Sequence, residues 1–236
     1  MKIVAIHQPN FFPWLGYFEK IVRCDAFVFL DHVQYQKTGG TWSNRVKLLI
    51  NGEPKWVTAP INRAFSGVRA LREIEFLSGA PWRNEMLRLL TLHYTKAPFF
   101  DETMKLLTPL ILNPDNNVAG YNSYSVMAIA TKLGVDTGKF HWSSQLPFEG
   151  SANELLITLV RSLRGTAYLC GGGAAGYQDD ILFGDAGLEV NYQNFRPQPY
   201  PQSGAGGFNA GLSIIDALMQ TGVVGAKALI SGSYSS

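Results

Sequence analysis

The sequence predicts an α/β protein whose sheet is mixed and partly parallel, and three stretches of the chain support this. A buried apolar run at 2–6 ends at His7, a helical pattern covers 15–23, and a second apolar run at 26–30 ends at Asp31. Strand, loop, helix and strand in such quick succession are typical of a Rossmann-like βαβ start, in which the two strands run parallel. An antiparallel hairpin and a helical middle region are expected to complete the fold.

The hairpin is predicted from two strand-like runs, 45–50 and 55–61, joined by Asn51-Gly52. Asn-Gly is favoured there because both residues adopt the left-handed backbone conformation that a tight hairpin turn requires. Further elements are expected in chain order: a strand at 71–77, helices from about 82 to 133 with breaks near Ala97-Pro98 and Asn113-Pro114, a strand at 139–143, a helix from a capping box at Ser151 and Glu154 to about 163, strands at 167–169 and 188–192, a last helix at 212–221 and a frayed tail from 231 to 236.

Length and composition indicate one folded domain. The 236 residues are 46% hydrophobic and 16% charged, which suits a single core and excludes disorder as the main state. We therefore expect one domain over 1–236, with a helical subdomain at about 80–135. The net charge of +2 argues against a nucleic-acid partner, because such proteins usually carry a basic stripe.

Cysteine usage and hydropathy indicate a cytoplasmic protein. Cys24 and Cys170 are the only cysteines, and neither lies in a metal-ligand spacing or a disulfide framework. The apolar run before His7 is too short for a signal peptide, and no apolar stretch is long enough to span a membrane. The oligomeric state stays open.

The first candidate site follows the first predicted strand. A polar pair at a strand end, then a proline-containing loop and a helix start, is where open α/β sheets bind ligands. His7 is the candidate general base or hydrogen-bond donor. The alternative is a satisfied histidine at a strand end with aromatic core residues around it. The substrate-binding residues expected from this segment are Gln8, Asn10, Gly16, Tyr17 and Lys20.

The second candidate site follows the second predicted strand. In a parallel pair, Asp31 ends on the same sheet edge as His7, so we expect its carboxylate to orient the imidazole as a second catalytic residue. Trp42, Asn44 and Arg45 are expected to bind substrate, with the guanidinium holding a phosphate or carboxylate. The alternative makes Asp31 a turn cap and Arg45 a surface residue.

The third candidate site is the glycine-rich stretch after 167–169, where Gly171, Gly172 and Tyr177 are expected to bind substrate. The stretch has neither a Walker A ending nor a dinucleotide-binding pattern. Cys170 is either a nucleophile or, as is commoner, a buried structural thiol. Tyr200 and Gln202 are expected to form a lid or wall. The sequence predicts no metal site and indicates no cofactor.

The same residues resemble the WbqC-like family of bacterial proteins along nearly the whole chain. The matching residues are His7-Gln8-Pro9, Pro13-Trp14-Leu15-Gly16-Tyr17, Asp25, Phe27 to Asp31, Trp42, Asn44-Arg45, Tyr168-Leu169, Tyr177, Tyr200-Pro201-Gln202, Phe208, Leu212-Ser213 and Asp216. The resemblance implies a role in O-antigen or other surface polysaccharide clusters, or in amino-sugar modification. Cys170 stands where relatives often carry serine, which argues against a hydroxyl nucleophile there.

Together these features favour a transferase that acts on an activated anionic small molecule. We expect an acyl or aminoacyl group to pass to a nucleotide-linked amino sugar, with a base, oriented dipoles and an anion site. A nucleotidyltransferase is the first alternative, although Tyr17 stands where such enzymes usually carry a second histidine. The second alternative is a non-catalytic carbohydrate-binding or assembly protein that uses its exposed aromatic side chains.

Overall fold

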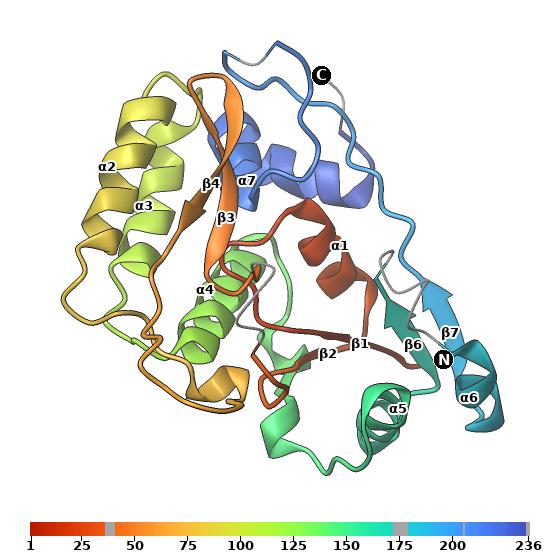
Figure 1. Ribbon diagram of the computed structural model, residues 1–236. Helices are drawn as coiled ribbons and strands as arrows, with labels where there is room; N and C mark the ends of the chain where they lie inside the picture. Colours follow the sequence, from red (N-terminus) through yellow and green to blue (C-terminus); the bar gives the residue numbers. More distant parts are fainter. Residues whose placement is uncertain (36–40, 172–178, 205, 235–236) are drawn as a thin grey trace.

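A parallel five-stranded sheet forms the centre of the molecule (Figure 1). The computed structural model describes residues 1–35, 41–171, 179–204 and 206–234. The strand order is β5-β2-β1-β6-β7, and the α/β class is confirmed. The strands are β1 (Ile3–His7), β2 (Ala26–Phe29), β5 (Phe140–Trp142), β6 (Ala167–Cys170) and β7 (Glu189–Tyr192).

The predicted βαβ start is present. Helix α1 (Leu15–Arg23) connects β1 to β2, which pair in parallel with His7 opposite Phe29. On its other side β1 pairs with β6, where Ala5 lies opposite Leu169. The strand that follows β1 in the chain, β2, therefore lies on one side of β1, and the later strand β6 lies on its other side. Such a reversal of strand order opens a crevice at the carboxyl ends of the two strands, here β1 and β6.

Alternate side chains of β1 enter two separate cores, as expected for a strand covered on both faces. Val4 and Ile6 pack with α5 (Ala152–Ser162) and α6 (Asp180–Asp185). Ala5 packs on the opposite face with α1, α4 (Val118–Lys132) and α7 (Ile214–Ser231). Figure 1 shows the same three layers, with α5 and α6 on one side of the sheet and α1, α4 and α7 on the other.

The antiparallel hairpin and the helical middle region also form as predicted. β3 (Arg45–Ile50) and β4 (Glu53–Thr58) make a two-stranded sheet of their own. Their turn has φ 53° at Asn51 and φ 78° at Gly52, the left-handed conformation expected of Asn-Gly. Three helices follow, with breaks at the two predicted prolines: α2 (Trp82–Tyr94), α3 (Phe100–Ile111) and α4.

The strand predicted at 71–77 is wrong. A 3-10 turn, η1 (Leu71–Glu73), begins this segment, and only isolated bridges follow it, from Glu75 to Asn117 and from Phe76 to Ile61. The Glu73 carboxylate accepts a hydrogen bond from the Ala70 backbone N–H at 2.7 Å. This local bond closes a turn that competes with extended pairing.

Three details of the second half differ from expectation. Ser151 begins α5, but its side chain makes no capping hydrogen bond. Helix α6 was not predicted. Helix α7 continues ten residues beyond Thr221, because Gly222 takes φ 67° and lets a second helical segment follow the kink. Two further 3-10 turns are η2 (Thr137–Lys139) and η3 (Ser143–Gln145).

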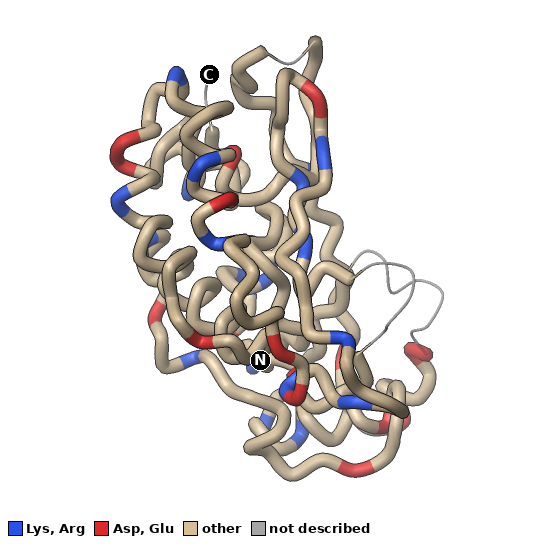
Figure 2. The backbone as a smooth tube through the Cα atoms, turned by 60° about the vertical axis from the view of Figure 1, so that its left-hand side comes forward, with Lys and Arg blue, Asp and Glu red and all other residues tan. Residues whose placement is uncertain are grey.

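Helix α7 is the one helix in the described ranges with the length and hydropathy of a membrane span. Its mean hydropathy is 1.3, but 67% of it is buried inside the fold. A helix that is apolar all round and largely enclosed by the protein has the character of a core helix. Figure 2 shows that positively and negatively charged residues are interspersed along the described chain.

Candidate functional site

A cavity of about 450 Å³ lies at the carboxyl edge of the sheet, where β1 and β6 separate. This is the crevice in which parallel α/β sheets bind ligands. Six of the residues predicted from sequence meet here although they come from three distant parts of the chain. The lining residues are His7, Asn10, Trp14, Tyr17, Lys20, Trp42, Gly171, Gln193, Ala210 and Gly211.

His7 ends β1 and has one ring nitrogen, Nε2, for which the described residues supply no hydrogen-bond partner. Its Nδ1 lies 3.0 Å from the carbonyl oxygen of Gln8, so Nδ1 carries the proton and donates it. Burial lowers the pKa of His7 from 6.5 to about 4, and the nearby Lys20 adds to this shift. The imidazole is therefore neutral at pH 7, with Nε2 as a hydrogen-bond acceptor at the cavity.

Tyr17 and Asn10 form the wall beside His7. The Tyr17 hydroxyl donates to the carbonyl oxygen of Gln8 at 2.9 Å, and burial raises its pKa well above 10. This phenol is therefore a neutral group that positions the loop after β1. Asn10 is 6% exposed and lines the cavity.

Lys20 reaches the cavity from the middle of α1 and is 2% exposed. Its Nζ donates to the carbonyl oxygen of Ile6 at 2.9 Å. Burial lowers the pKa of Lys20 to about 8, an effect partly offset by Cys170, Cys24 and Glu19. The amine thus titrates closer to neutral pH than an ordinary lysine does.

Gln193 is a lining residue that the sequence analysis missed. Its Nε2 donates to the carbonyl oxygen of Gly16 and to the Glu19 carboxylate. These two bonds tie the end of β7 to α1 behind the cavity. The available signal was positional, because Gln193 directly follows β7, just as His7 is the last residue of β1.

A smaller cavity of about 220 Å³ lies next to the first and shares Trp42 with it. Its lining residues are Gln8, Gln34, Tyr35, Thr41, Trp42, Ser43 and Leu71. Asn122 of α4 holds together the two loops that carry lining residues. Its Nδ2 donates to the carbonyl oxygens of Pro9 at 3.0 Å and of Ser43 at 2.7 Å. This buried amide was also missed from sequence.

Arg45 does not line either cavity but belongs to an aromatic surface beside them. The rings of Trp42 and Trp56 lie 4.9 Å apart, and the two indoles are 43% and 39% exposed. The Arg45 guanidinium lies 4.1 Å from the Trp56 ring and the Lys47 amine 5.1 Å from it. We call Trp42, Trp56, Arg45 and Lys47 the indole–cation surface.

Asp31 is turned away from His7, so the expected contact between the two does not form. Its carboxylate accepts hydrogen bonds from the Ser143 hydroxyl at 2.8 Å, the Ser144 hydroxyl at 2.6 Å and the Ser144 backbone N–H at 2.9 Å. His32, not His7, is the histidine at this cluster, with its Nδ1 2.5 Å from the Ser143 hydroxyl. Asp31 therefore joins β2 to the turn that follows β5.

Three other predicted substrate ligands have partners within the protein. Asn44 donates to the carbonyl oxygen of Ala59 and accepts from Thr41. The Tyr200 hydroxyl and the Gln202 amide both donate to Asp216, at 2.7 and 3.4 Å. These side chains organise the hairpin and the loop before α7.

Gly16 is not among the lining residues of the two neighbouring cavities, and its lack of a side chain has a packing reason. A Cβ atom at this position would overlap the indole of Trp14, which folds back over the first turn of α1. Gly172 and Tyr177, predicted from the glycine-rich stretch, lie outside the described residues. Gly171, just before them, does line the cavity.

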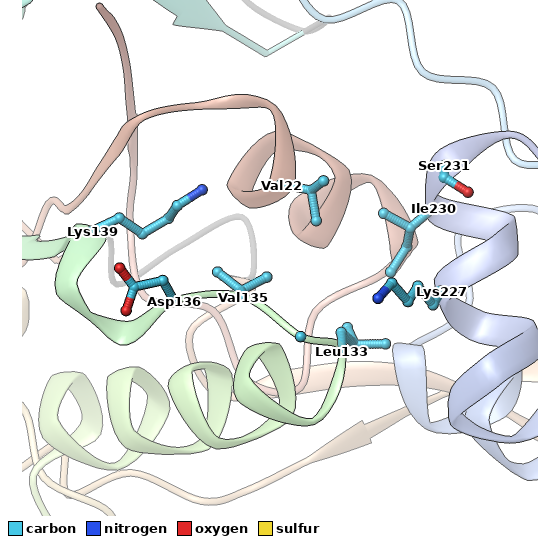
Figure 3. A pocket seen from close by; sticks show the side chains of 9 residues that line it. Val22, Leu133, Val135, Asp136, Lys139, Lys227, Ile230 and Ser231 are labelled. Carbon is cyan, nitrogen blue, oxygen red and sulfur yellow. The ribbon is translucent and has the colours of Figure 1, made fainter.

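A third cavity, of about 260 Å³, lies between the carboxyl end of α1, the loop after α4 and α7 (Figure 3). Its lining is mainly aliphatic, from Val22, Leu133, Val135 and Ile230. The Lys139 amine donates to the carbonyl oxygens at the end of α1, so it caps that helix. In the described ranges no group of three or more His, Cys, Asp or Glu side chains has a geometry for a metal ion.

The fold and the cavity define an α/β protein whose candidate ligand site lies at the strand-order reversal of a parallel sheet. The chain belongs to the WbqC-like protein family, whose pattern matches residues 8–228. It is 30% identical over 224 residues to the uncharacterized protein Rv1507c of Mycobacterium tuberculosis, covering 94% of this chain and 95% of that protein. No solved structure matches the chain.

Proposed function

We propose that this WbqC-like protein is a cytoplasmic transferase that passes an acyl or aminoacyl group from an activated donor to the amine of a nucleotide-linked sugar. The surface-polysaccharide context that the family resemblance implies supports this class of acceptor. Cys24 and Cys170 are both free thiols, as suits a reducing compartment.

The observation that carries the proposal is the convergence of His7, Asn10 and Lys20 on one cavity. Attack by a sugar amine on an acyl carbon needs the amine held in place and its proton removed. The neutral Nε2 of His7 accepts a hydrogen bond from that amine, and the Asn10 amide orients the neighbouring polar groups. A cavity of about 450 Å³ is large enough for one sugar with a small acyl group.

The indole–cation surface is the proposed place for the nucleotide part of the acceptor. Trp42 lines the cavity and at the same time contacts Trp56, so a ligand that leaves the cavity meets this surface next. Exposed indoles stack on a planar base, and Arg45 and Lys47 supply positive charge for the phosphates. Asp31 has no role in this proposal.

A thermal-shift and mass-spectrometry experiment tests the proposal. UDP-glucosamine at millimolar concentration is expected to raise the melting temperature of the protein, since a ligand that binds the folded state stabilises it. Trp42→Ala removes the shared wall and is expected to lower this shift. Acetyl-coenzyme A then serves as donor, and the sugar is expected to gain one acetyl group. The proposal is contradicted if a panel of amino-sugar nucleotides and acyl donors gives no melting shift and no gain in mass of the sugar.

A non-catalytic carbohydrate-binding protein is the second candidate. The exposed Trp42–Trp56 pair favours it, as does the absence of Asp31 and Arg45 from the cavity of His7. This alternative expects a melting shift with sugar that His7→Gln leaves unchanged, and no product with any donor.

A further inference from the structure

Lys20 is a buried amine in a cavity, and no carboxylate of the described residues pairs with it. Two ion pairs occur among the described residues, Arg23–Glu19 and Arg69–Glu73, and neither includes Lys20. A buried ammonium ordinarily needs a counter-ion, because removal from water without one favours the neutral form. The single hydrogen bond to the carbonyl oxygen of Ile6 uses one of the three ammonium donors.

The adjacent carboxylate of Glu19 is committed to other partners. Its Oε1 lies 3.2 Å from the Arg23 guanidinium, and its Oε2 accepts from Gln193. Glu19 therefore points along α1 and toward β7, and it leaves the Lys20 amine unpaired.

The other titratable groups around Lys20 carry no charge near neutral pH. Burial lowers the pKa of His7 to about 4 and raises that of Cys24 to about 11. Burial also raises the pKa values of Cys170 and Tyr168, whose ring centre lies 5.9 Å from the Lys20 amine. Lys20 is thus the one group of this set that changes charge close to physiological pH.

We propose that the Lys20 amine, in its neutral form, is the base that deprotonates the acceptor amine in the reaction proposed above. This inference rests on the proposed function and names the proton acceptor of that site. The neutral sugar amine attacks the acyl carbon with its lone pair and forms the C–N bond, while the neutral Lys20 amine takes one of the two protons of the attacking nitrogen. The bond from that carbon to the donor's leaving group breaks, and the leaving group departs with the electron pair. The Lys20 ammonium returns the proton to the leaving group.

His7 is not the proton acceptor in this scheme. An imidazole whose pKa lies near 4 is a weaker proton acceptor than an amine whose pKa lies near 8. The imidazole instead accepts a hydrogen bond at Nε2, while its Nδ1 stays bonded to Gln8.

Trace labelling with acetic anhydride tests the state of Lys20 without any knowledge of the substrate. The reagent is small enough for the cavity, and mass spectrometry of peptides gives the labelled fraction of each lysine between pH 6 and 11. Half-maximal reactivity of Lys20 is expected near pH 8, with the exposed Lys55 as reference and the same series in urea as the unfolded control. If Lys20 titrates together with Lys55, or stays unlabelled throughout, the inference is overturned.

Variants in the transfer assay test the catalytic role. Lys20→Arg keeps the positive charge but cannot lose its proton, so kcat is expected to fall about 10²–10⁴-fold while KM changes little. Methylamine is expected to restore part of the turnover of Lys20→Ala by acting as an external base. Lys139→Met is the matched control, because the Lys139 amine, like that of Lys20, donates to backbone carbonyl oxygens, but Lys139 does not line the cavity.

The outcomes separate the two proposals. The role of Lys20 is overturned if Lys20→Arg keeps full activity. It is also overturned if Lys20→Ala keeps its melting temperature and methylamine does not restore its turnover. Either outcome leaves the transferase proposal intact. Absence of turnover by the wild-type protein refutes the transferase, and with it the base, even if the labelling midpoint lies near pH 8.

Discussion

The imidazole of His7 meets the phenol ring of Tyr17 edge to face, with 4.7 Å between the ring centres. Both side chains also bond to the carbonyl oxygen of Gln8, His7 through Nδ1 and Tyr17 through its hydroxyl. This shared acceptor fixes the ring of His7 and leaves Nε2 at the cavity. The end of β1 and the first turn of α1 are thereby locked together.

His7 is expected to make stability depend on pH in the acidic range. Its pKa is about 4 in the folded protein and about 6.5 in the unfolded chain. A lowered pKa gives stability that is present above pH 6.5 and is lost as the pH falls toward 4. Because the ring is partly open to the cavity, we expect a loss of about 2 kcal/mol. Urea denaturation between pH 7 and 4 should show this loss in the wild type and not in His7→Gln, with His93→Gln as control.

Asp216 is expected to act in the opposite direction. This fully buried carboxyl accepts hydrogen bonds from the Tyr94 and Tyr200 hydroxyls, and burial raises its pKa from 3.8 to about 6. A raised pKa gives stability that is complete below pH 3.8 and is lost as the pH rises through 6. Asp216→Asn should remove about 2–3 kcal/mol of this pH dependence. Identical pH profiles of the free energy of unfolding for the wild type and Asp216→Asn would show that the pKa of Asp216 is not raised.

Gly16→Ala is expected to destabilise the protein by about 1–3 kcal/mol, because the new methyl group overlaps the indole of Trp14. Displacement of that indole should also deform the cavity it lines. Gly171→Ala is the matched control, since a Cβ there meets no atom of the described residues within 4 Å. Urea midpoints of the two variants check this, and equal midpoints would contradict the packing argument.

Asn122→Ala is expected to cost about 1–3 kcal/mol, because it leaves the carbonyl oxygens of Pro9 and Ser43 without their buried donor. The neighbouring Ser123 is a contrast, since its buried hydroxyl has no hydrogen-bond partner in the structure. Ser123→Ala should be neutral or slightly stabilising. Thermal denaturation distinguishes the two, and an equal loss in both variants would count against a role for Asn122 in holding the loops.

The βαβ start, the hairpin and the helical breaks were predictable because each has a short-range cause. The apolar runs before His7 and Asp31, the Asn51-Gly52 turn and the two prolines act within a few residues of themselves. The strand predicted at 71–77 failed because the Glu73 carboxylate closes a local turn, which apolar periodicity does not report. The full length of α7 was missed because Gly222 normally ends a helical pattern and here only bends it.

The candidate site was predictable in its position and less so in its members. Strand ends marked His7 and Gly171 correctly as neighbours, since parallel strands share one carboxyl edge. The direction of a side chain depends on the residues that pack beside it. Asp31 therefore bonds to Ser143 and Ser144, and Tyr200 bonds to Asp216.

By itself, then, the sequence determined the class of fold, the family and the edge of the sheet at which the cavity forms, because these follow from local propensity and strand order. Only the tertiary structure decided which polar groups remain free for a ligand. A buried donor or acceptor needs a hydrogen-bond partner, and distant segments supply it. The Gln193 amide donates to the Glu19 carboxylate, whereas no carboxylate of the described residues forms an ion pair with Lys20. That choice among partners is made in space, and no local pattern records it.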